Sequence, residues 1–101
     1  MVNERVYSKS RNYILGTIND IKEMQNGKGT PSDGPNGKIN FLVRLYYQKW
    51  EYQFTVTELD DSRCRVEIGI VGEVKKKEDK ILRQFALLDS MLAANSEIEH
   101  L

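Results

Sequence analysis

The N-terminal part of the chain carries a stripe of apolar residues at helical spacing. The residues recur every three or four positions, which is typical of an amphipathic α-helix with one buried face. The stripe consists of Ile14, Ile18, Ile21 and Met24. It predicts a helix over residues 8–24, with the hydroxyl of Ser8 or Ser10 as the N-cap and Asn26 and Gly27 closing the C-terminal end.

From residue 39 onward, the apolar residues recur at every second position. They alternate with polar residues along three successive runs that are rich in β-branched and aromatic side chains. This alternation predicts strands with one buried face and one exposed face. The runs cover residues 39–47, 50–58 and 63–72. Because short links join them, we expect a three-stranded antiparallel meander.

The register of this meander is constrained because cross-strand partners lie on the same face of a sheet. A two-residue turn at residues 48–49 would place Val43 opposite Phe54, so that the apolar faces coincide. At the second link an odd-length turn is needed, because such a turn places Val56 opposite Val66.

The clearest helical pattern follows the strands and predicts a helix over residues 75–95. Its apolar face consists of Ile81, Phe85, Leu88 and Leu92. Since both helices and one face of the sheet are apolar, we expect an α+β fold with two layers, a helix–β–β–β–helix arrangement in which both helices cover one face. The predicted core centres on Trp50, Phe54, Val66, Ile68, Phe85 and Leu88.

Two segments lack a regular period. Residues 26–38 are rich in glycine and proline, which predicts a flexible loop, although loops of this length also occur at binding sites. Residues 4–7 are consistent with three structures: the first turn of the helix, an extended lead, or a short fourth strand that covers the edge of the first strand.

The length and composition predict one globular domain over residues 1–101, with 40% hydrophobic and 30% charged residues. The 15 basic and 15 acidic side chains cancel, which removes the field that attracts nucleic acids or anionic membranes. No apolar run is long enough to span a membrane, and residues 1–10 lack the apolar core of a signal peptide. We therefore expect a cytoplasmic protein.

Side chains for catalysis are scarce. His100 is the only histidine and lies next to the C-terminal residue, while Cys64 is the only cysteine and falls on the inward face of a predicted strand. The adjacent acidic pairs at 60–61 and 78–79 suit a turn and a helix start better than two carboxylates flanking a substrate. We expect no enzyme activity, no cofactor and no metal site.

Three apolar residues point away from the predicted core: Leu42, Tyr46 and Val71. They leave the outward sheet face partly apolar, and a three-stranded sheet has two unprotected edges. The leading hypothesis is therefore a small non-enzymatic interaction or oligomerisation module. We expect a homodimer that pairs through the first strand, because its outward residues are less charged than those of the third; any other protein partner is undefined.

Lys75, Lys76, Lys77 and Lys80 form a basic cluster. The order helix, three strands, helix is similar to that of double-stranded RNA-binding domains, and residues 72–80 resemble the glycine- and lysine-rich start of that family's second helix. The resemblance implies polyanion binding through this cluster. The sequence departs from the family at Arg83 and Gln84, where the family has small residues, and at residues 48–49, which replace a histidine-bearing loop. Nucleic-acid binding is therefore an alternative rather than the main hypothesis.

Residues 50–92 resemble the closing strands and long C-terminal helix of the helix-grip superfamily, which includes lipid-transfer proteins and polyketide cyclases. This resemblance implies a third function, binding of a small apolar ligand between the C-terminal helix and the sheet, although the first strands of that fold are missing. The stretch at 33–39 and the following hairpins are also similar to small bacterial helix–three-strand–helix domains of unknown function.

Overall fold

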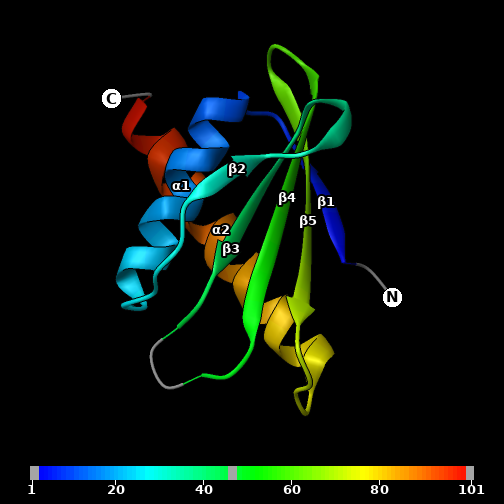
Figure 1. Ribbon diagram of the computed structural model, residues 1–101. Coiled ribbons are helices and arrows are strands. Elements are labelled where there is room, and N and C mark those ends of the chain that lie inside the picture. Colours follow the sequence, from blue (N-terminus) through cyan, green and yellow to red (C-terminus); the bar gives the residue numbers. More distant parts are fainter. Residues whose placement is uncertain (1–2, 46–47, 100–101) are drawn as a thin grey trace.

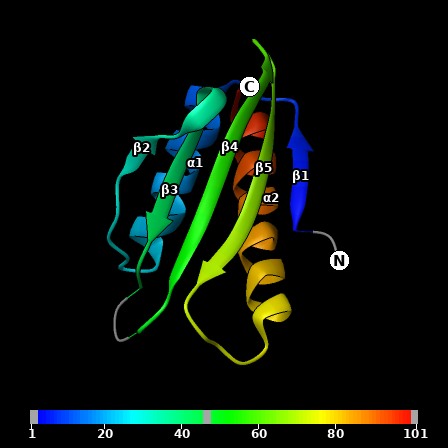
Figure 2. The same cartoon turned by 45° about the vertical axis from the view of Figure 1, so that its right-hand side comes forward.

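The computed structural model describes residues 3–45 and 48–99 (Figure 1). Its elements are β1 (Glu4–Tyr7), α1 (Arg11–Met24), β2 (Pro31–Asp33), a 3₁₀ turn (Pro35–Gly37), β3 (Lys38–Val43), β4 (Glu51–Asp60), β5 (Arg63–Val71) and α2 (Lys77–Glu99). The strands form one antiparallel sheet in the order β1-β5-β4-β3-β2. Both helices pack on the same face of this sheet (Figure 2). The expected α+β class and two-layer arrangement are confirmed.

The core lies between the helices and the sheet. All six residues predicted to form its centre are buried, and none is more than 9% exposed. The other buried apolar side chains include Ile14, Ile18 and Ile21 from α1 and Phe41, Val43, Val56 and Ile70 from the strands. The two helical stripes and the inward strand positions therefore meet as their spacing predicts.

The three expected strands pair as a meander, but the sheet has two strands more than expected. β1 pairs with β5, and β2 pairs with β3. Residues 4–7 are therefore a fourth strand, but they cover the edge of the third expected strand and not that of the first. The expectation of a three-stranded sheet was wrong because these short segments show no period of their own.

β2 lies inside the segment that was predicted to be a flexible loop. The bridge between Lys28 and Arg44 continues the register in which Ser32 faces Asn40, so residues 28–33 run along β3 as one irregular strand. Backbone hydrogen bonds of 2.8 and 2.9 Å join Lys28 and Arg44 in both directions. Much of the segment thus has a fixed position on the sheet.

The register of the first hairpin differs from the expected one by two residues. Val43 faces Tyr52 and not Phe54, and the link between β3 and β4 is longer than a two-residue turn. Arg44 pairs with Lys28 instead of continuing the ladder with β4. Because the shift is an even number of residues, the apolar faces still coincide.

In the second hairpin Val56 faces Val66, as predicted. A β-bulge just before Asp60 keeps the two faces in phase, instead of an odd-length turn. The Asp60 carboxylate accepts hydrogen bonds from the Ser62 N–H at 2.9 Å and from the Arg63 Nε at 2.7 Å. These bonds close the turn.

The ends of the helices follow the capping signals only in part. The hydroxyl oxygen of Ser10 accepts a hydrogen bond from the Tyr13 N–H at 3.3 Å, so the second candidate serine is the N-cap of α1. α1 ends ahead of Asn26, which has a φ of 55°. α2 continues to Glu99, beyond its expected end. Across the described part of the chain, no helix has both the length and the apolar character needed to cross a membrane.

Candidate interaction surface

No described element covers the face of the sheet opposite the helices. Figure 2 shows both helices behind the sheet, so the side chains that alternate with the core residues point away from the helices. On the three central strands these outward positions are Lys38, Asn40 and Leu42, then Glu51, Gln53, Thr55 and Thr57, and finally Arg63, Arg65, Glu67, Gly69 and Val71. We call this surface the open sheet face.

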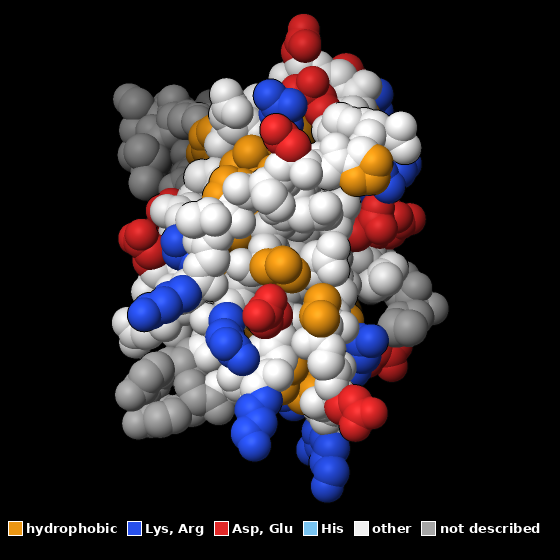
Figure 3. All heavy atoms as spheres, viewed as in Figure 1, with side chains coloured by type: hydrophobic (Ala, Val, Ile, Leu, Met, Phe, Trp, Pro, Cys, Tyr) orange, Lys and Arg blue, Asp and Glu red, His pale blue; other side chains and the backbone are white. Residues whose placement is uncertain are grey.

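Two of the three residues expected to support self-association lie on the open sheet face. Leu42 and Val71 are 41% and 49% exposed. Tyr46 lies outside the described residues. In Figure 3, hydrophobic side chains on the visible side of the sheet form separate spots among polar atoms. Interfaces between proteins that also exist apart are about as apolar as the rest of a protein surface, so an interface of this kind needs no larger apolar patch.

The expected dimer contact, an unpaired edge of the first strand, is not present. That strand is β3, and β2 covers it, so β3 is not an edge of the sheet. Two copies cannot pair through β3 into one continuous sheet unless β2 first leaves. The expectation was wrong because it assumed that the segment before β3 had no regular structure.

The two real edges of the sheet are protected against pairing. β2 has three residues, and its Pro31 has no N–H to donate. The carbonyl of Gly29, next to β2, accepts a hydrogen bond from the Lys22 Nζ at 3.1 Å. β1 has four residues and begins with the charged Glu4. The structure therefore favours contacts through the open sheet face over contacts through an edge.

A hollow of about 200 Å³ lies on the open sheet face. It is lined by Asn3, Gln53, Thr55, Glu67, Ile68 and Gly69. Gly69 leaves this space because it has no side chain, and an added Cβ would meet no neighbouring atom within 4 Å. Gln53 pairs with Gly69 on one side and with Leu42 on the other. The face therefore carries an apolar projection and a hollow in the same row.

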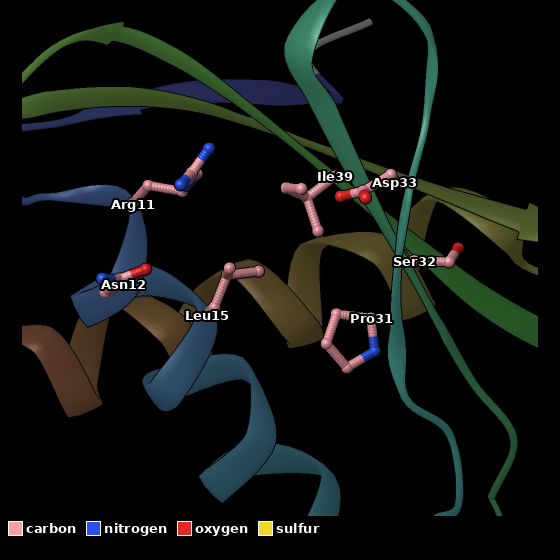
Figure 4. Close-up of a pocket in the computed structure, with 7 residues that line it drawn as sticks. All are labelled: Arg11, Asn12, Leu15, Pro31, Ser32, Asp33 and Ile39. Atoms are coloured by element: carbon pink, nitrogen blue, oxygen red, sulfur yellow. The ribbon is translucent and has the colours of Figure 1, made fainter.

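A second concave feature lies between α1 and β2 (Figure 4). This groove of about 320 Å³ is lined by Arg11, Asn12, Leu15, Pro31, Ser32, Asp33 and Ile39. It exists because α1 packs mainly over β4 and β5. Arg11 and Asp33 bring opposite charges to the groove, so its field selects neither anions nor cations. We assign it no ligand.

The lysines expected to contact polyanions lie at the start of α2. Residues 75–77 are exposed, whereas the Nζ of Lys80 donates a hydrogen bond to the carbonyl of Lys75 at 2.8 Å. Glu78 and Asp79 follow directly and are also exposed. Lys80 therefore stabilises the local turn, and acidic side chains reduce the positive field of the remaining lysines.

The space between α2 and the sheet, where an apolar ligand was the third hypothesis, is occupied by core side chains. Val66, Ile68, Phe85 and Leu88 have no exposed surface. The interior under α2 is therefore filled by the chain itself.

Asp89 joins α2 to β1 through side-chain hydrogen bonds. Its carboxylate accepts hydrogen bonds from the Tyr7 hydroxyl at 2.6 Å and from the Arg5 guanidinium. Arg5 also lies over the Phe85 ring, with 4.8 Å between the guanidinium carbon and the ring centroid. Sequence analysis missed this cluster, although Arg5 and Tyr7 have the two-residue spacing of one strand face. The contacts fix β1 on the helical layer, which is a structural role.

Tyr7 should make the fold sensitive to alkaline pH. Burial raises the pKa of the Tyr7 hydroxyl, and the Asp89 carboxylate raises it further. The unfolded chain releases this proton near pH 10 while the folded chain keeps it, so this contribution is full below about pH 10 and is lost as the pH rises. We expect Tyr7→Phe to lose less stability than the wild type between about pH 9 and about pH 11 in urea unfolding. Equal losses would contradict this role.

Gln84 is another polar residue whose role sequence analysis missed. It is 1% exposed, and its side-chain amide exchanges hydrogen bonds of 3.0 and 3.1 Å with the amide of Gln25. The pair joins the end of α1 to α2 and satisfies both amides. Gln84 stands where double-stranded RNA-binding domains have a small residue, and here it serves to connect the two helices.

The described residues bring together no evident catalytic group. Burial raises the pKa of the Cys64 thiol, which favours the neutral thiol over the nucleophilic thiolate. The hydrogen bond from Arg63 lowers the pKa of Asp60, whose carboxylate closes the turn. His100 lies outside the described residues. Within the described ranges, no three His, Cys, Asp or Glu side chains are grouped so that they could hold a metal ion.

The open sheet face is thus the surface on which the outward residues of three strands meet, and the function has to be argued from it. Family models, curated proteins and solved structures give no match to this chain.

Proposed function

We propose that the protein is a small non-enzymatic interaction module that self-associates through its open sheet face. The observation that carries the proposal is the uncovered face itself, on which Leu42 and Val71 are exposed while the edges of the sheet are protected. An antiparallel sheet can leave a polar face in water, but the exposed Leu42 and Val71 make this face partly apolar, and a covering layer would bury them. A second copy of the chain would supply that layer.

The size of the open sheet face suits a reversible dimer. The five strands hold 32 residues in total, and at a rise of about 3.3 Å per residue and a strand spacing of about 4.8 Å they cover roughly 500 Å² per copy. A standard stable interface buries roughly 800 Å² per partner. The centre of the face is uncharged, because Asn40, Gln53 and Thr55 occupy it. We therefore expect a dissociation constant in the micromolar range, as is typical of a modest interface.

The two alternative functions have less support. Polyanion binding would depend on the exposed lysines at 75–77, next to Glu78 and Asp79. Apolar-ligand binding would need space under α2 that core side chains occupy. We also propose the cytoplasm as the compartment, where Cys64 would stay reduced.

Amide chemical shifts measured during dilution test the proposal. Between about 200 and about 5 µM, we expect the amides of Gln53, Thr55 and Glu67 to shift, because a dimer with a dissociation constant of a few micromolar loses about half of its population over this range. Arg83 and Ala86 are exposed on α2 and serve as internal controls. Shifts confined to the helices, or constant shifts throughout, would contradict the proposal.

A further inference from the structure

Nothing in the described part of the chain explains why residue 69 is a glycine. Glycine weakens the interior of a strand, and Gly69 lies inside β5. Its φ is not in the left-handed region, and the β-bulge of this hairpin lies at the other end, before Asp60. An added Cβ would meet no neighbouring atom within 4 Å. Close approach of a second molecule is the remaining reason for glycine in a strand.

Leu42 and the hollow at Gly69 lie symmetrically about β4. Both residues pair with Gln53, so each lies one strand spacing, about 4.8 Å, to one side of β4. A twofold axis that runs parallel to β4 and passes over Gln53 exchanges these two positions between two copies. In this row of the sheet, the open sheet face is therefore complementary to itself.

We infer that two copies pack open face to open face about this axis, each seating its Leu42 in the other's Gly69 hollow. The inference rests on the proposed self-association and specifies its geometry. The hollow of about 200 Å³ is larger than the roughly 150 Å³ cavity that accepts a benzene ring, so one leucine side chain fits. A twofold contact of this kind is closed, which limits the assembly to a dimer.

Other pairs across this axis set the strength of the dimer. Asn40 and Glu67 both pair with Thr55, so the amide of Asn40 faces the Glu67 carboxylate of the other copy. Glu51 is the next outward residue of β4 after Gln53, and it faces its own counterpart near the axis. Because like charges repel, added salt and Glu51→Gln should each strengthen the dimer.

Light scattering across a dilution series tests the geometry with matched variants. Leu42→Ala removes the projection and Gly69→Leu fills the hollow, and we expect each to raise the dissociation constant at least about tenfold. The double variant moves the leucine from β3 to β5 and the space from β5 to β3. We therefore expect its dissociation constant to return to within about threefold of the wild-type value. Leu82→Ala truncates a leucine that is 46% exposed on α2. It should leave the dissociation constant within about twofold of the wild-type value.

The outcomes separate this geometry from the proposed function. A wild-type protein that stays monomeric would overturn both the self-association and the geometry. A wild-type dimer that both single variants leave intact would overturn the geometry alone. A double variant as weak as the single variants would overturn the pairing of position 42 with position 69. Urea unfolding at protein concentrations below the dissociation constant measures the stability of the monomer of each variant. An unchanged free energy of unfolding shows that the substitution affects association and not folding.

Discussion

Phe85→Ala should lower the free energy of unfolding by roughly 3–5 kcal/mol. The Phe85 ring is fully buried between α2 and the sheet. The Arg5 guanidinium lies over the ring. Removing the ring leaves a cavity between a hydrogen-bonded sheet and a long helix, and neither can collapse far enough to fill it. Urea unfolding at low protein concentration measures the loss without a contribution from association.

Leu82→Ala is the matched control for this truncation, because Leu82 lies three residues earlier on the same helix and is 46% exposed. We expect it to change the free energy of unfolding by less than about 1 kcal/mol. If Phe85→Ala and Leu82→Ala unfold at the same urea concentration, Phe85 is not part of the core and the packing of α2 on the sheet is wrong.

Gly29→Ala should lower the free energy of unfolding by about 2–4 kcal/mol, because steric clash and backbone strain act together. The segment 28–33 lies so close to β3 that a Cβ at Gly29 would be 1.8 Å from the carbonyl oxygen of Leu42. Gly29 also has a φ of 151°, which other residues rarely adopt. The segment must therefore move away from β3, and the exposed edge should make the variant prone to aggregation.

The same substitution at Gly16 is the control for Gly29→Ala. Gly16 lies inside α1, is exposed, and an added Cβ there would meet no neighbouring atom within 4 Å. Gly16→Ala should raise the free energy of unfolding by up to about 1 kcal/mol, because alanine favours a helix. The two glycine-to-alanine substitutions should therefore change the free energy of unfolding in opposite directions. A Gly29→Ala variant as stable as Gly16→Ala would contradict the pairing of residues 28–33 with β3.

Sequence periodicity was sufficient for the elements that bury a whole face. α1, the meander and α2 each repeat their apolar spacing over several turns or strand positions, so the stripe around Phe85 and the alternation around Phe54 could be recognised directly. The alternation also placed Leu42 and Val71 on the outward face, and both are exposed there.

Short strands could not be predicted in this way. β1 and β2 have four and three residues, which is too short to show a period, and what holds them is a partner far away in the sequence. Tyr7 and Asp89 are 82 residues apart, so no local sequence pattern predicts their hydrogen bond. The hollow at Gly69 was hidden for the same reason, since it depends on the register that sets Gly69 and Leu42 on either side of Gln53.

The solution mass of the unmodified chain tests the central claim, self-association through the open sheet face, most directly. At about 100 µM, light scattering should give twice the chain mass of 11.7 kDa, and the mass should fall toward that of one chain below about 1 µM, as mass action requires for a micromolar dimer. A mass of one chain at every concentration would contradict the account.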